Sequence, residues 1–301
     1  MTLPPGATER FGHANGLRLH VVEAGPPDGP PVVLLHGFPE LWYGWRRQIG
    51  PLAAAGHRVI VPDQRGYNTS DKPRGAAAYR VGTLAADVTG LLDALGIERA
   101  DIVGHDWGGV VAWWLSLAHP ARVRRLAILN APHPAVMRRQ LSRNPRQALR
   151  SWYVFFFQVP RLPERFLARD GYANLARAVR GGRRGTCTDE DLAVYRTAWA
   201  QPGALTAMLN WYRAALRAAG TRLPRLRVGV PTLVLWGARD PFLGREMAEP
   251  SVALCDDGRL EIFESATHWL QHDEAEAVSG RLLGFLGLEA RPAEEPDPRS
   301  G

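Results

Sequence analysis

Short apolar runs rich in β-branched residues recur along the chain and alternate with longer stretches of helical spacing. The apolar runs are residues 17–22, 32–35, 59–61, 102–103, 123–129, 232–235 and 260–263. Residues 84–95, 110–118 and 274–286 carry apolar side chains at the spacing of a helix that buries one face. Strands that alternate with helices predict an α/β fold, in which a mostly parallel sheet is flanked by helices on both faces.

The alternation stops between residues 134 and 222. That segment has no strand-like run and is typical of aromatic, arginine-rich helices separated by prolines and glycines. We therefore expect a core domain of residues 1–133 and 223–290, with a helical cap (lid) domain inserted at 134–222. Residues 291–301 carry prolines and charges without an apolar anchor, which predicts a disordered tail.

The composition limits the class of protein. Of the 301 residues, 46% are hydrophobic and 22% are charged, as in soluble globular proteins. No apolar run reaches the roughly 18 residues of a membrane-spanning helix, and the first ten residues lack the apolar centre of a signal peptide. We expect no membrane span and a cytoplasmic location. Cys187 and Cys255 match neither a disulfide framework nor zinc-ligand spacing, so we expect no structural metal.

The net charge of +7 is unevenly distributed. The expected cap holds 16 arginines and five acidic residues, a net charge of +11, whereas Lys72 is the only lysine in the chain. A solvated arginine face on a protein with a compositional bias explains this pattern. The alternative is a cap that attracts anionic substrates or contacts an anionic membrane. We expect no nucleic-acid partner.

A glycine-flanked turn follows the apolar run at 102–103. Residues 104–109 read Gly-His-Asp-Trp-Gly-Gly, and a helical stretch begins directly afterwards. A nucleophile elbow needs small residues two positions before and after the nucleophile, as Gly104 and Gly108 are, because this turn between strand and helix is tight. The candidate nucleophile is Asp106, in place of a serine. The alternative is a glycine-rich turn with an incidental aspartate.

Three further segments complete a candidate site. Residues 36–39, His-Gly-Phe-Pro, follow a strand-like run, so that the N–H groups of Phe38 and Trp107 would form an oxyanion hole. Asp240 and His268 each follow a later strand-like run, in the order nucleophile, acid, histidine. The alternative interpretation of Asp240 is an ordinary aspartate in a turn before a proline, without a catalytic role. His268 and His272 are four residues apart, but no catalytic glutamate lies between them, which argues against a metal site.

These motifs resemble those of the α/β-hydrolase fold and, more narrowly, of the epoxide hydrolases, from about residue 13 to residue 286. The resemblance rests on segments 36–40, 63–67, 70–73 and 105–109 together with Asp240 and His268. In that family the elbow aspartate is the nucleophile, and two cap tyrosines face it and hold the epoxide oxygen. The resemblance assigns these tyrosines to Tyr153 and Tyr212, which from the sequence alone are ordinary core aromatics.

The resemblance implies a two-step hydrolysis without a cofactor. Asp106 opens the epoxide to form an ester, Tyr153 and Tyr212 protonate the oxygen, and His268, oriented by Asp240, activates water to release a vicinal diol. The residue chemistry agrees, because a carboxylate that attacks a saturated carbon forms an ordinary ester. The expected partners are thus a small-molecule epoxide and water. We expect Trp107, Phe38, Trp152 and Leu270 to line the substrate pocket.

Two other functions remain open. A haloalkane or haloacid dehalogenase uses the same nucleophile, and the indole N–H of Trp107 can hold a halide. Against this, Phe38 lacks a side-chain donor for the halide, and Asn130 lacks the charge of the acid that some dehalogenases carry at that position. A non-catalytic ligand-binding protein with the same fold is the second alternative. The sequence leaves the oligomeric state, monomer or homodimer, undecided.

Overall fold

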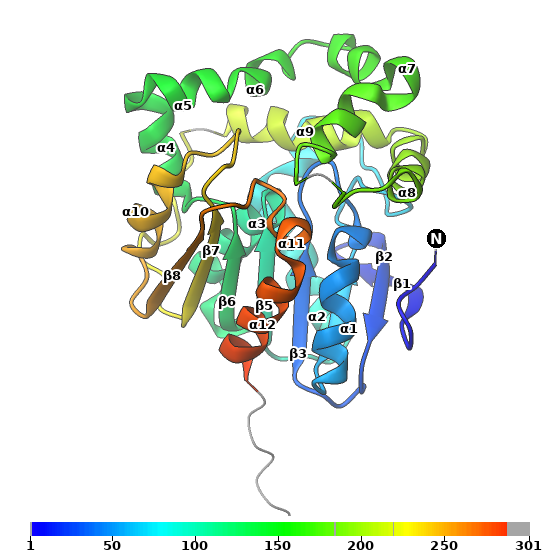
Figure 1. Ribbon diagram of the computed structural model, residues 1–301, viewed down its shortest axis with the longest axis vertical. Coiled ribbons are helices and arrows are strands. Elements are labelled where there is room, and N and C mark those ends of the chain that lie inside the picture. The colour runs from blue at the N-terminus through cyan, green and yellow to red at the C-terminus, as the bar shows by residue number, and fades with distance from the viewer. Residues whose placement is uncertain (1, 184, 219, 288–301) are drawn as a thin grey trace, which may run out of the picture.

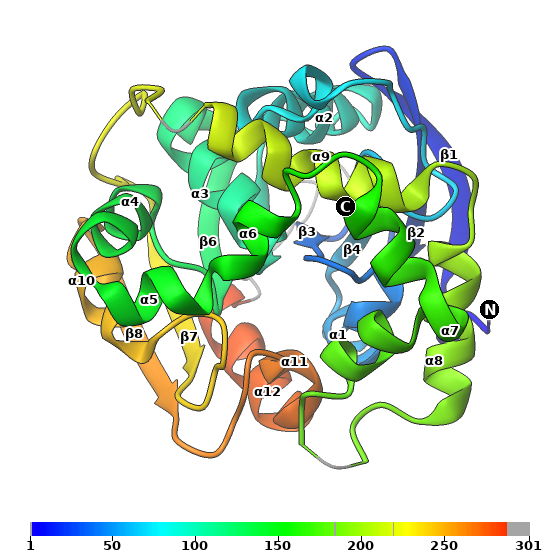
Figure 2. The same cartoon turned by 90° about the horizontal axis from the view of Figure 1, so that it is seen from above.

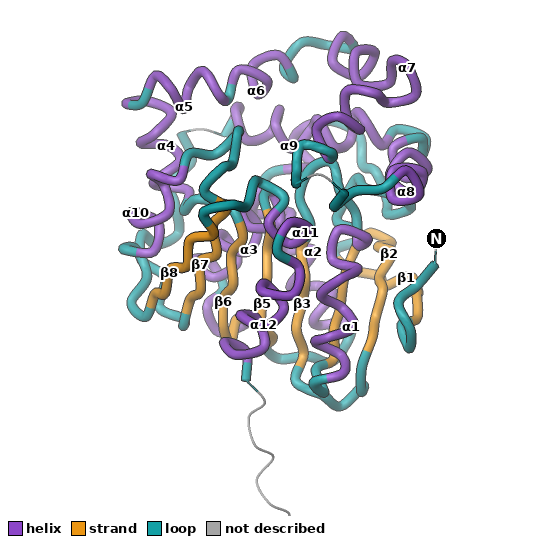
Figure 3. Tube along the Cα trace, in the orientation of Figure 1, coloured by secondary structure: helices purple, strands orange, loops and turns teal. Residues whose placement is uncertain are grey.

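A sheet of eight strands forms the centre of the protein in a computed structural model that describes residues 2–183, 185–218 and 220–287. The strand order is β1-β2-β4-β3-β5-β6-β7-β8 (Figures 1 and 3). The strands are β1 (Thr8–Ala14), β2 (Leu17–Ala24), β3 (Pro31–Leu35), β4 (Arg58–Pro62), β5 (Ala100–His105), β6 (Val123–Leu129), β7 (Thr232–Gly237) and β8 (Gly258–Phe263). β2 pairs antiparallel with β1 and β4, and all other neighbours are parallel. The predicted α/β fold with a mostly parallel sheet is confirmed.

The central strands are apolar because both faces of the sheet are covered. Every residue of β5 and β7 is buried, and β3 and β4 are buried after their first residue. β1 was missed in the sequence analysis: it is an edge strand whose first four residues are exposed, so it has no continuous apolar run. The other seven strands coincide with the predicted runs.

Helices pack on both faces of the sheet. Figure 2 shows α2 and α3 on one side of the strands and α1 and α12 on the other. α10 packs against β7 and β8. The helices of this layer are α1 (Arg46–Ala54), α2 (Val81–Ala94), α3 (Trp107–Ala118), α10 (Ala248–Val252), α11 (Leu270–Asp273) and α12 (Ala275–Leu286). Short 3-10 turns are η1 (Trp42–Trp45), η2 (Ala76–Tyr79), η3 (Pro120–Arg122) and η4 (Arg245–Met247).

Six helices between β6 and β7 form a separate layer above the carboxyl ends of the parallel strands (Figures 1 and 2). They are α4 (Pro134–Arg143), α5 (Pro145–Arg150), α6 (Trp152–Phe156), α7 (Leu162–Val179), α8 (Asp189–Trp199) and α9 (Ala204–Arg217). The backbone of α7 is not helical at residues 169–172, so α7 consists of two helical pieces joined by a kink. We call this layer the cap; its division from the core at residues 134 and 222 remains our interpretation. The predicted tail at 291–301 lies outside the described residues. None of the helices described is long and apolar enough to cross a membrane.

Candidate active site

Asp106 lies in the turn between β5 and α3. Its backbone has φ 50° and ψ −119°, a conformation that a non-glycine residue adopts only when its surroundings enforce it. The close packing of the turn supplies that constraint, because a Cβ at Gly108 would lie 2.0 Å from the carbonyl oxygen of Leu35. The turn directs the Asp106 carboxylate toward the carboxyl end of β3, and 17% of this side chain is exposed. This is the geometry expected of a nucleophile elbow.

The two carboxylate oxygens of Asp106 have different partners. The backbone N–H of Phe38 donates to Oδ1 at 2.8 Å, and Nε2 of His268 lies 3.5 Å from Oδ2. The loop after β3 can approach Asp106 closely because residue 37 is glycine. A Cβ at this position would lie 2.4 Å from the Cβ of Asp106. The backbone of Trp107 begins α3 beside the carboxylate, and its part in an oxyanion hole stays a prediction.

His268 is held by Asp240. Nδ1 of His268 lies 2.6 Å from Oδ2 of Asp240. The other oxygen, Oδ1, accepts the backbone N–H groups of Phe242 at 2.7 Å and Leu243 at 2.9 Å. Because the Asp240 carboxylate is fixed by these donors, it orients the imidazole so that Nε2 faces Asp106. The structure therefore brings together the three residues proposed as nucleophile, acid and base.

Asn130 is a further member of this group whose role the sequence analysis missed. It directly follows β6, and its amide Nδ2 donates to Oδ2 of Asp240 at 2.8 Å, while its Oδ1 accepts the N–H of Gly237 at 2.9 Å. The amide thus joins the end of β6 to the end of β7 and helps to fix Asp240. The available signal was its position as a polar residue immediately after a buried strand.

The charges of these groups shift their proton affinities. Burial alone would lower the pKa of His268, but Asp240 and Asp106 raise it to about 10. Burial alone would raise the pKa of Asp106, but the hydrogen bond and charge of His268, with smaller contributions from His105 and the Phe38 N–H, lower it. At neutral pH the resting site therefore contains an ionised Asp106 beside a cationic His268.

The two predicted tyrosines lie on cap helices that cover the turn with Asp106. Tyr153 is on α6 and Tyr212 is on α9, and their rings lie 5.9 Å apart. The ring of Tyr212 packs edge-on against Phe38 at 5.2 Å and Trp107 at 5.0 Å. Burial, together with the negative charge of Asp106, raises the pKa of both phenols above the usual value. Both hydroxyls therefore keep their protons at neutral pH.

Other aromatic rings surround the tyrosines. Phe157 packs on Tyr212 at 5.0 Å, and Phe242 contacts Tyr153 at 5.9 Å and His268 at 5.2 Å. The sequence analysis missed Phe157 and Phe242, since a phenylalanine in an apolar run carries no signal of the direction of its side chain. Together with Phe38 and Trp107 they make the surroundings of Asp106 predominantly apolar.

One residue predicted to line the substrate pocket lies at the surface. Trp152 is 58% exposed and its ring contacts Tyr153 and Phe156. Leu270 is fully buried at the start of α11, two residues after His268, and its part in the pocket stays a prediction. The aromatic run 152–157 did not reveal which of its members face inward, because it lacks polar residues that would mark an outer face.

Comparison with known proteins identifies the family. A family model described as alpha/beta hydrolase fold matches residues 30–275. The chain belongs to the α/β-hydrolase fold family. It is 45% identical to the AB hydrolase superfamily protein YfhM of Bacillus subtilis, over 93% of this chain and 98% of that protein. It is 38% identical to Epoxide hydrolase A of Mycobacterium tuberculosis, over 94% of this chain and 99% of that protein.

A solved structure supports the same assignment. The crystal structure of the Bacillus megaterium epoxide hydrolase in complex with an inhibitor superposes with a TM-score of 0.85 at 27% sequence identity. The match covers 92% of this hydrolase and 99% of that chain. The similarity therefore includes the cap as well as the sheet.

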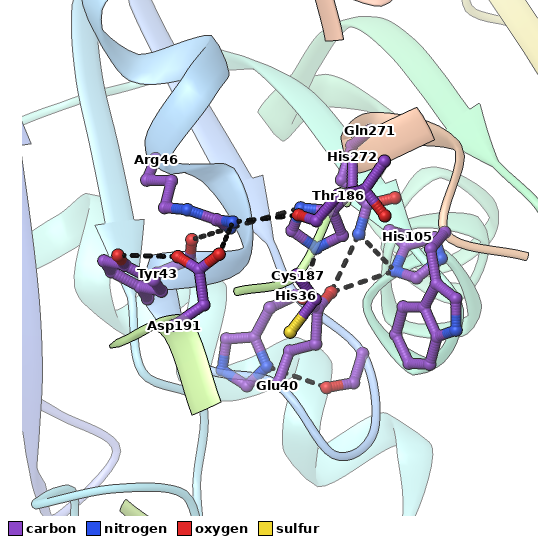
Figure 4. A network of polar contacts seen from close by, with 12 residues as sticks. His36, Glu40, Tyr43, Arg46, His105, Thr186, Cys187, Asp191, Gln271 and His272 are labelled. Atoms are coloured by element: carbon purple, nitrogen blue, oxygen red, sulfur yellow. Dashed lines mark hydrogen bonds and ion pairs between the residues drawn. The ribbon is translucent and has the colours of Figure 1, made fainter. Parts of the chain in front are cut away.

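A buried polar network lies behind the base of this hydrolase (Figure 4). Glu40 lies in the loop after β3, four residues after His36. It accepts hydrogen bonds from Tyr195 of α8 at 2.6 Å and from Nε2 of His272 at 2.7 Å. Its other oxygen accepts from Gln271 at 2.8 Å. Burial alone would raise the pKa of Glu40, but the imidazoles of His272 and His105 hold it well below its usual range. The carboxylate is therefore an ionised link between core and cap.

The same network reaches the catalytic loop. Nε2 of His105 donates to the backbone carbonyl of His268 at 2.8 Å, and its Nδ1 lies 3.1 Å from Nε2 of Gln271. His105 and Gln271 thus fix the backbone of the base. In the sequence, the only signal for His105 was its place in the elbow, so its contact across the sheet was not predictable. No group of three or more potential metal ligands occurs among the described residues.

The cap is also anchored directly on the core. Asp191 in the first turn of α8 forms an ion pair with Arg46 at 3.0 Å and accepts a hydrogen bond from Tyr43 at 2.9 Å. The indole of Trp199 at the other end of α8 donates to the carbonyl of Pro39 at 2.6 Å. α8 therefore holds the loop that carries Phe38 in a fixed place relative to the cap.

Proposed function

We propose that the protein is an epoxide hydrolase that opens an epoxide to a vicinal diol through a covalent ester on Asp106. The observation that carries the proposal is the arrangement around this residue: a His268–Asp240 pair at one carboxylate oxygen, and two protonated cap tyrosines near the same side chain. Relatives named epoxide hydrolases support the substrate class.

In the first step, Oδ2 of Asp106 attacks one carbon of the epoxide and the carbon–oxygen bond of the ring breaks. The oxygen receives a proton from Tyr153 or Tyr212, since an alkoxide is a poor leaving group without a proton donor. Oδ1 of Asp106 stays on the Phe38 N–H. The product is a hydroxyalkyl ester of Asp106 and a tyrosinate.

Ester formation changes the charges in the site. Asp106 becomes neutral, so it no longer raises the pKa of His268 or of the two tyrosines. The pKa of His268 falls, so the imidazole can pass its proton to the tyrosinate left by the first step and then act as a base. The pKa values of the tyrosines fall as well, because the loss of the Asp106 charge removes a repulsion that opposes the tyrosinate. The loss of one charge thus favours both the tyrosinate of the first step and the neutral imidazole needed in the second.

In the second step, His268 takes a proton from water, and the resulting hydroxide attacks the ester carbonyl of Asp106. The N–H of Phe38 stabilises the oxyanion that forms. Collapse breaks the bond between the carbonyl carbon and the alkyl oxygen, releases the diol and restores Asp106. The sum of both steps adds one water to one epoxide, with the proton returned to the tyrosine.

The dehalogenase alternative uses the same nucleophile but gains nothing from the tyrosines. A halide leaves as an anion and needs no proton, and the side chain of Phe38, packed against Tyr212 and Phe157, offers no hydrogen-bond donor. The paired phenols, whose protons are retained at neutral pH, favour an epoxide over an alkyl halide.

A single turnover of styrene oxide in ¹⁸O-water tests the proposal. With enzyme in excess, the ester route puts the first labelled oxygen into Asp106, which digestion and mass spectrometry detect, and leaves the diol unlabelled. The variant His268→Gln should accumulate an adduct on Asp106 with the mass of the epoxide. Labelled diol with unlabelled Asp106 would show direct attack by water. Absence of diol together with halide release from alkyl bromides would favour the dehalogenase.

A further inference from the structure

Large apolar side chains are exposed on the cap helices farthest from the sheet. Leu149 is 74% exposed, Phe155 is 59% exposed and Trp152 is 58% exposed, in or beside α5 and α6. Val159, Leu162 and Phe166 continue the set through the link to α7. We call these six residues the outer cap face. In Figure 1, α5, α6 and α7 form the top of the molecule.

Aromatic contacts connect the two helices, α6 and α7, that carry part of the outer cap face. The ring of Trp152 lies 5.9 Å from that of Phe156, which in turn lies 5.5 Å from Phe166, so aromatic contacts join α6 to α7. Figure 2 shows α5, α6 and α7 following one another across the upper side. A patch of large exposed apolar side chains is typical of an interaction site.

Exposed arginines accompany the apolar side chains. Residues 145–170 contain five arginines and two acidic residues, a net charge of +3. The arginines Arg146, Arg150, Arg161, Arg165 and Arg169 are all exposed. Of the two acids, Glu164 pairs with Arg213 of α9 at 2.8 Å and Asp170 pairs with Arg169 at 3.6 Å. The apolar side chains of the outer cap face thus lie in a segment of net positive charge.

This combination fits one partner better than others. Interfacial helices bind anionic membranes by burying aromatic and aliphatic side chains at the level of the head groups, while arginines pair with lipid phosphates. A second copy of this chain, docked through the same face, would place the two arginine sets against each other. We propose that the outer cap face docks the hydrolase on an anionic membrane surface, without a membrane span.

Docking through this face would also bring the site close to its substrate, an inference that rests on the proposed function. Tyr153 directly follows Trp152 on α6, so the docked helix is the one that carries a proposed proton donor. An apolar epoxide dissolved in the lipid would then lie close to the cap. Docking itself needs no catalysis and is tested without a substrate.

Sedimentation with lipid vesicles tests the docking. Vesicles of phosphatidylcholine with about 30% phosphatidylglycerol should bind the protein, and pure phosphatidylcholine should bind it much more weakly, because the arginines need anionic lipid. The double variant Leu149→Ser/Phe155→Ser should reduce the binding by about tenfold or more. The matched control Leu226→Ser/Phe11→Ser changes an exposed leucine and an exposed phenylalanine outside the cap and should bind like the wild type.

The charge is tested in the same assay. The triple variant Arg146→Gln/Arg150→Gln/Arg165→Gln should lose binding, whereas Arg74→Gln/Arg259→Gln, at exposed positions of the core, should lose less. Thermal unfolding by circular dichroism checks that each variant folds. Failure to bind either vesicle, or equal binding by the outer-face and control variants, would overturn the proposal. A dimer in sedimentation velocity that Leu149→Ser/Phe155→Ser abolishes would assign the face to a second copy and would also overturn it.

Discussion

The charge of Asp106 determines the protonation of the groups around it. It contributes to the raised pKa of His268, Tyr153 and Tyr212, and its own pKa is lowered chiefly by His268. These effects are reciprocal, because the attraction between two charges favours the charged form of both. A single carboxylate therefore couples the base and the acids of the proposed reaction.

Removal of that charge should lower the pKa of His268. In the variant Asp106→Asn only Asp240 remains to raise it, so NMR titration of the imidazole should give a pKa below the wild-type value of about 10. Since the folded pKa exceeds the unfolded value, His268 stabilises the wild type fully below about pH 6.5, and this stabilisation is lost as the pH rises through about 10. Between about pH 7 and about pH 10, the free energy of unfolding measured in urea should fall less in the variant than in the wild type. The difference between the two falls should exceed about 1 kcal/mol. Equal imidazole pKa values would contradict the coupling.

The tyrosines should matter for epoxides and not for substrates that need no proton. We expect Tyr153→Phe or Tyr212→Phe to lower kcat for styrene oxide by about 10²-fold each, because one proton donor is lost. The double variant should be almost inactive while unfolding at a similar temperature, since phenylalanine keeps the ring contacts. Stopped-flow measurement of ester formation checks which step is slowed. If ester formation keeps its wild-type rate in both single variants, neither tyrosine protonates the epoxide oxygen.

At the scale of elements, the site depends on loops that follow parallel strands. β3 and β5 are neighbours, and the loops after them place Phe38 and Asp106 in contact. β7 and β8 supply Asp240 and His268 from the same edge of the sheet. Parallel strands make this possible because their carboxyl ends meet at one edge, where α/β proteins place their sites.

The close approach of the β3 loop to the elbow gives a test at this scale. We expect Gly37→Ala to destabilise the fold by about 1–3 kcal/mol, since its Cβ would lie 2.4 Å from the Cβ of Asp106. Displacement of Asp106 should also lower kcat/KM by about 10²-fold. The control Gly280→Ala, on α12 with open space around it, should stabilise the fold by about 0.5–1 kcal/mol. Urea unfolding and steady-state kinetics check both, and wild-type kinetics in Gly37→Ala would contradict the tight packing.

Patterns in the sequence predicted elements where burial is uniform. Strands such as β5 and β7 are buried along their whole length and so appear as apolar runs. β1 was not predicted from the sequence because most of its residues are exposed. α1 was not predicted because it contains Pro51 and has few apolar positions. Residue propensity and hydrophobic periodicity predict an element less well where it lies at the edge of a sheet or is stabilised mainly by tertiary contacts.

At the scale of the whole molecule, α8 ties the cap to the core through buried charges. Glu40 accepts hydrogen bonds from Tyr195 of the cap and from His272 beside the base loop, and the Arg46–Asp191 pair lies in the same network (Figure 4). An ionised carboxylate with several donors is stable when buried, but it becomes costly when its partners are mismatched.

Neutralising Glu40 should therefore loosen the cap. Glu40→Gln turns one acceptor into a donor that faces the existing donors, which should destabilise the fold by about 1–3 kcal/mol. Hydrogen exchange should accelerate in α8, which the network anchors. The control Glu98→Gln, at an exposed position, should change the stability by less than about 0.5 kcal/mol. Unchanged exchange in α8 would show that the cap does not depend on Glu40.

The sequence by itself determined the α/β fold, the extra helical segment, the elbow with Asp106, and the order in which Asp240 and His268 follow. These features are local: they depend on hydrophobic periodicity, on glycines in tight turns and on polar residues directly after strands. The two tyrosines came from a family resemblance, because an aromatic residue in a helix does not show which way it faces.

Only the tertiary structure decided which side chains meet. Asn130, Phe157 and Phe242 join the site, Trp152 stays at the surface, and Glu40 connects the cap to the base loop. These outcomes depend on contacts between segments far apart in the chain, and on which face of a helix is buried by a neighbour. The same is true of the pKa values, since burial and the distances between charges exist only in the folded chain.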